Sequence, residues 1–204
     1  MFERAFPCYS LEPSSFDGFS ALIGERQAYA PRMEDDGVCR LKPILKGPFP
    51  SLALSAFLPL KKILLPHREI IWSFKNDQFS VDEDRQPFAV VGVPLCDLQA
   101  VWYLDQVFAD DAHYQARRRQ SLLVGMSCDP GAECCCDRNL MPVAGDLFVD
   151  EDRAWALSPA GEDLLKSFGC LNPEELSLPW PEGLRKIRPE ISEEQYRESE
   201  DANV

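Results

Sequence analysis

Two continuous apolar runs stand out along the chain, FAVVGV at 88–93 and SLLVGM at 121–126. Short runs of this kind predict strands that are buried on both faces. Between them, DLQAVWYLDQVF at 97–108 and DAHYQARRRQ at 111–120 have helical spacing, and Asp97 is a suitable N-cap. This crossover is long enough to make the two strands parallel. The apolar face of the first helix consists of Leu98, Val101, Trp102 and Phe108.

The N-terminal part of the chain predicts smaller elements. Residues 1–60 alternate short apolar runs with turn signals, which indicates short strands and irregular chain. A basic stretch with apolar spacing follows at 61–65, and EIIWSF at 69–74 fits either a strand or a helix.

The C-terminal part predicts a hairpin, a helix and a tail. DLFV at 146–149 and AWAL at 154–157 flank a polar turn, and 159–169 has a proline near its start and a glycine at its end. We expect one domain over 1–171 and an acidic, proline-containing tail over 172–204, disordered or ordered only against a partner. The expected fold is α/β with mixed α+β character. It has a small sheet with parallel strands, crossover helices, a β-rich or irregular N-terminal part, and a C-terminal hairpin and helix.

The charge and composition exclude several classes of function. The 204 residues carry a net charge of -13, which disfavours binding to nucleic acid or to an anionic membrane surface. Only two histidines occur, so a three-histidine zinc site is excluded. The first residues do not resemble a signal peptide and no apolar run reaches transmembrane length, so we expect a cytoplasmic protein without membrane insertion. In that compartment clustered cysteines more often bind a metal than form disulfides.

Cysteine is the unusual residue of this chain, and five of the eight form one group. Cys96 follows the first predicted parallel strand and Cys128 follows the second, so both thiols are expected at the same edge of the sheet. In an extended loop, Cys134 and Cys136 share a side and Cys135 faces the other way. A metal centre is the main interpretation of Cys96, Cys128, Cys134 and Cys136, with buried free thiols and a redox disulfide as alternatives. The three scattered cysteines, Cys8, Cys39 and Cys170, are expected to be buried thiols.

Other candidate residues carry weaker signals. His67 and His113 are expected at the surface or in packing rather than in catalysis. The run at 117–119 is three arginines and is expected to be a solvated helix face; the alternative is that it neutralises thiolates or binds an acidic partner. No Gly-x-Gly occurs, so a dinucleotide fingerprint and a phosphate loop are absent.

Four segments together resemble a known family. They are KKILLPHREIIWSF at 61–74, VVGVPLCDLQAV at 90–101, DAHYQARRR at 111–119 and LLVGMSCDPGAECCC at 122–136. The pattern resembles the iron–sulfur β subunits of cytosolic hydrogenases and sulfur reductases, and the corresponding iron–sulfur subunit of anaerobic sulfite reductase. The resemblance covers roughly residues 20–160, the N-terminal domain of that family.

The sequence also departs from the family pattern. Pro94 and Leu95 stand where the family has Arg-Pro, and Cys135 replaces an aromatic residue. The family usually continues into a two-cluster ferredoxin domain, whereas this sequence contains no C-x-x-C.

The resemblance implies an electron-transfer subunit of a multisubunit cytosolic oxidoreductase. It implies one [4Fe-4S] cluster on Cys96, Cys128, Cys134 and Cys136, with Cys135 as the spare candidate, and a partner subunit that carries a flavin or an iron–sulfur cluster. The chain itself would be non-catalytic. A zinc-stabilised or cluster-free scaffold or assembly subunit is the alternative, and a thiol–disulfide enzyme is a third interpretation.

Overall fold

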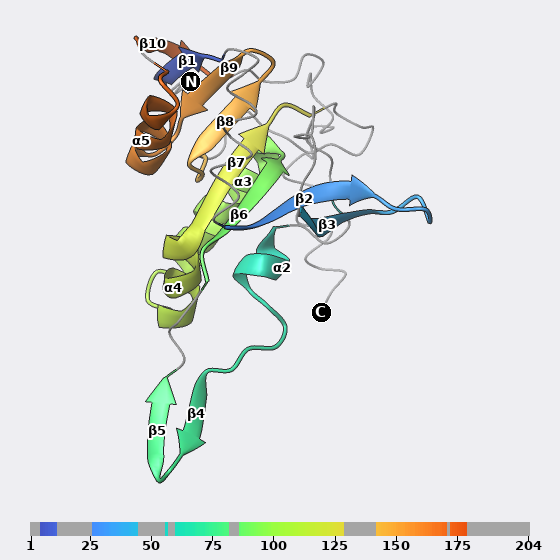
Figure 1. The fold of residues 1–204 in the computed structure, drawn as a ribbon, viewed down its shortest axis with the longest axis vertical. Coiled ribbons are helices and arrows are strands. Elements are labelled where there is room, and N and C mark those ends of the chain that lie inside the picture. The colour runs from blue at the N-terminus through green and yellow to red at the C-terminus, as the bar shows by residue number, and fades with distance from the viewer. Residues whose placement is uncertain are drawn as a thin grey trace, which may run out of the picture.

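The computed structural model describes residues 5–11, 26–44, 56, 60–81, 86–128, 142–170 and 172–178. Within these residues, the main sheet has eight strands in the order β10-β1-β9-β8-β7-β6-β2-β3 (Figure 1). Its strands are β1 (Ala5–Ser10), β2 (Gln27–Met33), β3 (Cys39–Ile44), β6 (Phe88–Val93), β7 (Ser121–Met126), β8 (Leu147–Asp150), β9 (Arg153–Ala156) and β10 (Glu174–Ser177). A separate two-stranded sheet pairs β4 (Trp72–Lys75) with β5 (Gln78–Val81). The helices are α2 (Lys61–Leu64), α3 (Leu95–Val107), α4 (Ala112–Gln120) and α5 (Pro159–Ser167).

Four parallel strands form the centre of the main sheet. β6 pairs in parallel with β2 on one side and with β7 on the other, and β7 pairs in parallel with β8. The two predicted strands at 88–93 and 121–126 are confirmed with the same bounds, and they are parallel neighbours joined by α3 and α4. Every residue of β6 is buried, as its continuous apolar sequence requires. We call the edge where these four strands end the carboxyl edge, and the opposite one the amino edge.

Helices cover the two faces of the sheet differently. Leu98 and Val101 of α3, Tyr114 of α4 and Leu64 of α2 belong to one apolar cluster, together with Val90 and Leu123 of the sheet. On the other face, Leu165 of α5 packs with side chains of β1, β8 and β9. Figure 1 shows α5 beside these antiparallel strands. The mixed α/β fold predicted from the sequence is confirmed.

The C-terminal hairpin and helix form close to their predicted positions. β8 and β9 pair in antiparallel register around a turn in which Glu151 has φ 46°. Ser158 caps α5 by accepting a hydrogen bond from the Gly161 amide at 3.2 Å. Gly169, with φ 79°, follows the end of the helix, where a glycine is expected.

The first and last described strands pair with each other. β1, within the region where the sequence predicts short strands and irregular chain, lies between β9 and β10 in the antiparallel half of the sheet. Glu174–Ser177, which the sequence places in the C-terminal tail, forms the edge strand β10 against β1. Leu178 directly after it is buried. Alternation within this segment is weak, so only its pairing with the distant β1 makes it a strand.

None of the helices within the described ranges has the length and apolar character needed to cross a membrane.

Candidate metal-binding edge of the sheet

Cys96 and Cys128 lie at the carboxyl edge, after two neighbouring strands. β6 ends at Val93 and β7 ends at Met126, and the register pairs Val93 with Gly125. Cys96 therefore lies three residues beyond one strand, and Cys128 two residues beyond the other. Both side chains are half-buried. The predicted edge argument is confirmed for these two thiols, and open α/β sheets bind ligands at this edge.

A bulge directs the chain from β6 into α3. The pairing of β6 with β7 shifts register between Val91 and Val93, and Gly92 between them has φ 76°. A left-handed φ favours glycine, and a bulge turns the strand end away from its regular path. The helix then begins at Leu95 with Pro94 at the N-cap, so the prediction of Asp97 as N-cap is wrong. Pro94 can take this place because the N-cap residue has an extended conformation and its backbone N–H is not needed by the helix. The Pro94 carbonyl accepts hydrogen bonds from the backbone amides of Asp97 and Leu98.

A glycine in β7 lets α3 approach the sheet closely. A Cβ at Gly125 would lie 2.6 Å from Leu98 Cδ1 and 2.7 Å from Phe148 Cδ2. The Leu98 carbonyl also accepts a hydrogen bond from the Ala144 amide at 3.0 Å. Leu98 is two residues from Cys96, and Gly125 is three residues from Cys128. This contact therefore fixes the segments that carry the two cysteines relative to each other.

The first turn of α3 gives the Cys96 position a favourable electrostatic setting. Cys96 is the second residue of a 13-residue helix, where unpaired amides and the helix dipole favour negative charge. Asp97 beside it is half-buried, and burial raises the pKa of its carboxyl group, which Lys61 partly opposes.

The other predicted ligands, Cys134, Cys135 and Cys136, lie outside the described residues. Within the described ranges, no group of three or more His, Cys, Asp and Glu side chains is placed to bind a metal. The structure thus places two of the four predicted ligands, Cys96 and Cys128, at the same edge of the sheet. Two thiols from neighbouring parallel strands are soft donors of the type that iron–sulfur clusters and zinc require.

The three scattered cysteines are buried thiols, as predicted. Cys8, Cys39 and Cys170 are buried in the strands β1 and β3 and after α5. Burial raises the pKa of Cys8 to about 11, with Arg153 opposing the shift, and it also raises the pKa values of Cys39 and Cys170. Neutral, buried thiols of this kind are packing residues rather than ligands.

The arginine run forms the expected solvated helix face only at Arg119, which is exposed. Arg117 is buried, donates to the Leu64 carbonyl at 2.6 Å and forms an ion pair with Glu69. Arg118 pairs with Asp105 at 3.1 Å. A single residue, Gln120, separates the run from β7, so the run lies at the amino edge, away from Cys96 and Cys128. The alternative role of neutralising the thiolates is therefore also wrong.

The histidines match the sequence expectation of a surface or packing role. His67 is exposed beyond α2, and His113 is half-buried in the first turn of α4. Neither lies in the segments that lead to Cys96 and Cys128.

Asp146 is a buried structural residue that the sequence analysis missed. Its Oδ2 accepts from the Leu123 amide and its Oδ1 accepts from the Ser158 hydroxyl, both at 2.8 Å. Its backbone also exchanges hydrogen bonds with Leu123 and Leu157. Asp146 therefore joins β7, the β8–β9 hairpin and the start of α5, and all of its polar atoms are used in packing the fold.

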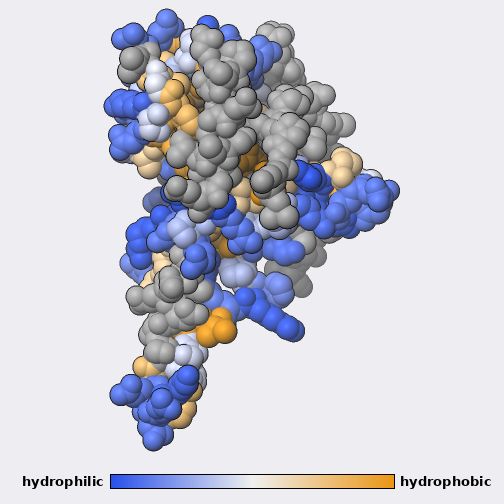
Figure 2. All heavy atoms as spheres, in the orientation of Figure 1, coloured by the Kyte–Doolittle hydropathy of each residue, from blue (hydrophilic) through white to orange (hydrophobic). Residues whose placement is uncertain are grey.

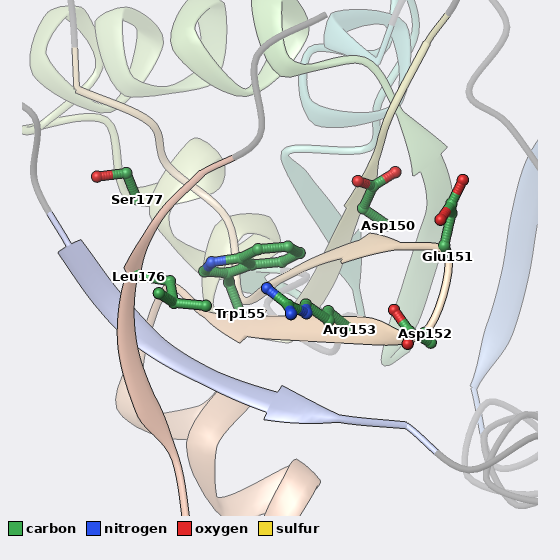
Figure 3. Close-up of a pocket in the computed structure, with 7 residues that line it drawn as sticks. All are labelled: Asp150, Glu151, Asp152, Arg153, Trp155, Leu176 and Ser177. Atoms are coloured by element: carbon green, nitrogen blue, oxygen red, sulfur yellow. The ribbon is translucent and has the colours of Figure 1, made fainter.

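A separate pocket of about 430 Å³ lies at the turn between β8 and β9. Figure 3 shows Trp155 and Arg153 side by side at its centre, with three carboxylates on one side and residues of β10 on the other. The indole Nε1 of Trp155 is buried and has no hydrogen-bond partner in the described structure. The lining contains no cysteine; it consists of Asp150, Glu151, Asp152, Arg153, Trp155, Leu176 and Ser177. This pocket is therefore distinct from the positions of Cys96 and Cys128.

The roles of Gly92 and Gly125 could have been found from the sequence. Both β6 and β7 have Val-Gly as their fourth and fifth residues, in FAVVGV and SLLVGM. An isolated glycine inside a strand pattern indicates a bulge or a close backbone approach. Gly92 provides the bulge and Gly125 the close approach.

The fold and the site define the class of protein. It is an α/β protein whose four parallel strands bring two cysteines to the carboxyl edge, as a candidate thiolate site for a metal. Among curated proteins, the chain is 35% identical over 83 residues to sulfhydrogenase 2 subunit beta of Pyrococcus furiosus. The match covers 39% of this chain and 25% of the relative, so the chain spans about a quarter of that protein's length. No protein-family model and no solved structure matches the chain. The match supports the relationship to hydrogenase β subunits that the cysteine pattern predicted.

Proposed function

We propose that this chain is an electron-transfer subunit of a multisubunit oxidoreductase, holding one [4Fe-4S] cluster on Cys96, Cys128, Cys134 and Cys136. The main support is the position of Cys96 and Cys128 after two adjacent parallel strands, at one edge of the sheet. The similarity to a sulfhydrogenase β subunit supports the same assignment. When bound, such a cluster supplies one-electron transfer.

The chain's own residues hold and shield this site. Cys96 presents its thiol from the first turn of α3, and Gly125 allows Leu98 to fix that turn on β7. Val93 and Leu95 are buried directly before Cys96, so the site is backed by apolar side chains. An apolar backing limits solvent access, which is one of the factors that set a cluster's potential.

The proposal includes a partner and a compartment. The sequence has no motif for binding a flavin or a nucleotide, so a second subunit carrying a flavin or an iron–sulfur cluster would supply or accept the electrons. We place the complex in the cytoplasm, where the thiols remain reduced. Docking near the carboxyl edge would bring the two redox centres close together.

Zinc is the competing ligand of the same residues. Four thiolates also suit a tetrahedral structural zinc, and a zinc-bound or metal-free chain would be a scaffold or assembly subunit. The two proposals differ in iron, sulfide and zinc content.

The experiment is metal and sulfide analysis of the anaerobically purified full chain and of single Cys→Ser variants. We expect about four irons and four sulfides per chain in the wild type. Cys96→Ser, Cys128→Ser, Cys134→Ser and Cys136→Ser should each lose most of the iron, whereas the matched control Cys135→Ser should retain it. Stoichiometric zinc without sulfide would contradict the cluster and support the scaffold. Loss of iron in Cys135→Ser together with its retention in Cys134→Ser would refute the proposed ligand set.

A further inference from the structure

The hairpin of β4 and β5 projects from the body of the protein. We call residues 70–79 the hairpin arm. In Figure 1 it extends beyond α4, and its two strands pair with each other in a sheet of their own. Asn76 and Asp77 connect the strands with φ values of 51° and 59°, as a two-residue hairpin turn requires. The register pairs Phe74 with Phe79 and Lys75 with Gln78.

One face of the hairpin arm is apolar and exposed. Trp72 and Phe74 alternate along β4, and Phe79 is opposite Phe74, so the three rings share a face. Their centroids lie 5.2 Å apart for Trp72 and Phe79, and 4.8 Å for Phe74 and Phe79. The three side chains are 57%, 55% and 71% exposed, in chain order, and Figure 2 shows apolar side chains on the surface of this projection.

In β4, the apolar Trp72 and Phe74 alternate with the polar Ser73 and Lys75, which is the pattern of a strand with one buried face. Ile70 and Ile71, which lead into the arm, are also more than half exposed. A two-stranded hairpin alone is marginally stable, and a contiguous exposed apolar patch marks an interaction site. The arm therefore has the properties of a surface that another molecule covers.

The base of the hairpin arm is held firmly by the core. Leu60 and Leu64 of the α2 segment are buried. Arg117 of α4 donates to the Leu64 carbonyl and forms an ion pair with Glu69, the residue before the arm. Because the base of the arm is already fixed in the free protein, binding through the three rings would lose little conformational entropy there.

The exposed charges near the arm are mostly positive, although this stretch of sequence is not basic overall. Residues 60–81 carry four bases and two acids, and 82–85 add three acids and one base, so 60–85 has no net charge and the remainder carries -13. Lys62 and Arg68 are exposed in the segment that leads to the arm, and Lys75 is exposed on it. Glu69 of this segment is paired with Arg117. A complementary surface is therefore apolar and rimmed with carboxylates.

We propose that the hairpin arm docks into an apolar, carboxylate-rimmed groove on a neighbouring subunit of the oxidoreductase complex; this rests on the function proposed above. Contact between the arms of two copies fits less well, because it would bring the same lysines together. Docking of the arm on the acidic remainder of a second copy is the competing outcome, which the crosslinks below distinguish. A membrane surface also fits less well. The tip, Lys75 to Gln78, is polar, and the strongly acidic remainder would be repelled by anionic lipid.

The arm and the cysteine positions lie at opposite edges of the sheet. The arm leaves from Glu69, which is paired with the last turn of α4, just before β7 begins. Cys96 and Cys128 follow the strands at the carboxyl edge. Docking through the arm therefore leaves the carboxyl edge open to an electron donor or acceptor.

The test uses the tagged full chain expressed in its native host and purified anaerobically with its complex. A carbodiimide reagent joins lysines directly to carboxylates in contact with them, and mass spectrometry identifies the joined peptides. We expect Lys61, Lys62 or Lys75 to be joined to Asp or Glu of one co-purifying subunit that contains a flavin or an iron–sulfur cluster. The double variant Trp72→Ser/Phe79→Ser should recover at least ten-fold less of that subunit. The matched control Gln78→Ala, on the polar face, should recover it fully.

A charge variant and two further measurements keep the test decisive. Lys62→Glu/Lys75→Glu should also reduce recovery, even if the ring variant folds poorly. Full recovery with both double variants would overturn the proposal, as would crosslinks confined to this chain or to a second copy. Co-sedimentation of the wild type with phosphatidylserine vesicles, abolished by Trp72→Ser/Phe79→Ser, would reassign the arm to membrane binding. Iron content distinguishes the docking proposal from the cluster proposal. The arm variants should contain as much iron as the wild type. Absence of iron from the wild type and from every variant would refute the cluster but not the docking.

Discussion

At the scale of single residues, burial separates the cysteines into two groups. Cys8, Cys39 and Cys170 are buried, whereas Cys96 and Cys128 are half-buried at the carboxyl edge. The sequence predicted this division from spacing alone, because scattered cysteines pack in cores and clustered ones bind metals.

The buried group should resist alkylation in the native protein. Because the pKa of Cys8 is raised from 9.0 to about 11, its thiolate fraction at pH 8.5 should be roughly 80-fold lower than that of an ordinary thiol. Raising the pH toward 11 should increase labelling, since a raised pKa keeps the thiol protonated below it. Peptide mapping after iodoacetamide treatment measures this, with guanidinium-unfolded protein as the control. Equal labelling rates in the native and unfolded protein would show that Cys8 is not buried.

Arg117 shows why the sequence analysis failed at some residues. A run of three arginines on a predicted helix is usually solvated, and nothing local distinguishes the first of them. Its partners, the Leu64 carbonyl and Glu69, are 53 and 48 residues away in sequence. The prediction of Asp97 as N-cap was wrong for a more local reason, because Pro94 occupies the N-cap position and the helix begins at Leu95.

At the scale of elements, α5 depends on one close contact with the hairpin. A Cβ on Gly161 would lie 1.9 Å from the Asp146 carbonyl oxygen, which is backbone and cannot move as a side chain can. The sequence predicted the helix and its end, because proline and glycine signals are local. It gave no sign of this contact, because Asp146 is a neighbour only through the fold.

Gly161→Ala should therefore destabilise the protein although alanine is the better helix former. We expect a loss of about 1–3 kcal/mol from overpacking, against a gain of about 1 kcal/mol in helix propensity. Urea unfolding followed by circular dichroism measures the change in the free energy of unfolding. Asp163→Ala, at an exposed position of the same helix, is the control and should be neutral or slightly stabilising. A stabilised Gly161→Ala variant would show that α5 does not pack on Asp146 in this way.

At the scale of the whole molecule, some strand pairings of the main sheet could be predicted from the sequence and others could not. The parallel pair β6 and β7 was predicted because both strands are continuous apolar runs separated by a helical crossover. In the antiparallel half the β8–β9 hairpin was predicted from its local turn. The pairing of β1 with β10 was not, because these strands come from opposite ends of the chain and pair only in the folded state. We propose that the cluster-binding domain includes β10, so that the tail expected over 172–204 begins after Leu178.

The central claim is that the cysteines of the carboxyl edge hold one iron–sulfur cluster. Electron paramagnetic resonance of the anaerobically purified full chain, reduced with dithionite, tests it most directly. The account predicts a signal typical of a reduced [4Fe-4S] cluster, integrating to about one spin per chain and lost in Cys128→Ser. A chain that shows no such signal and contains stoichiometric zinc would contradict it.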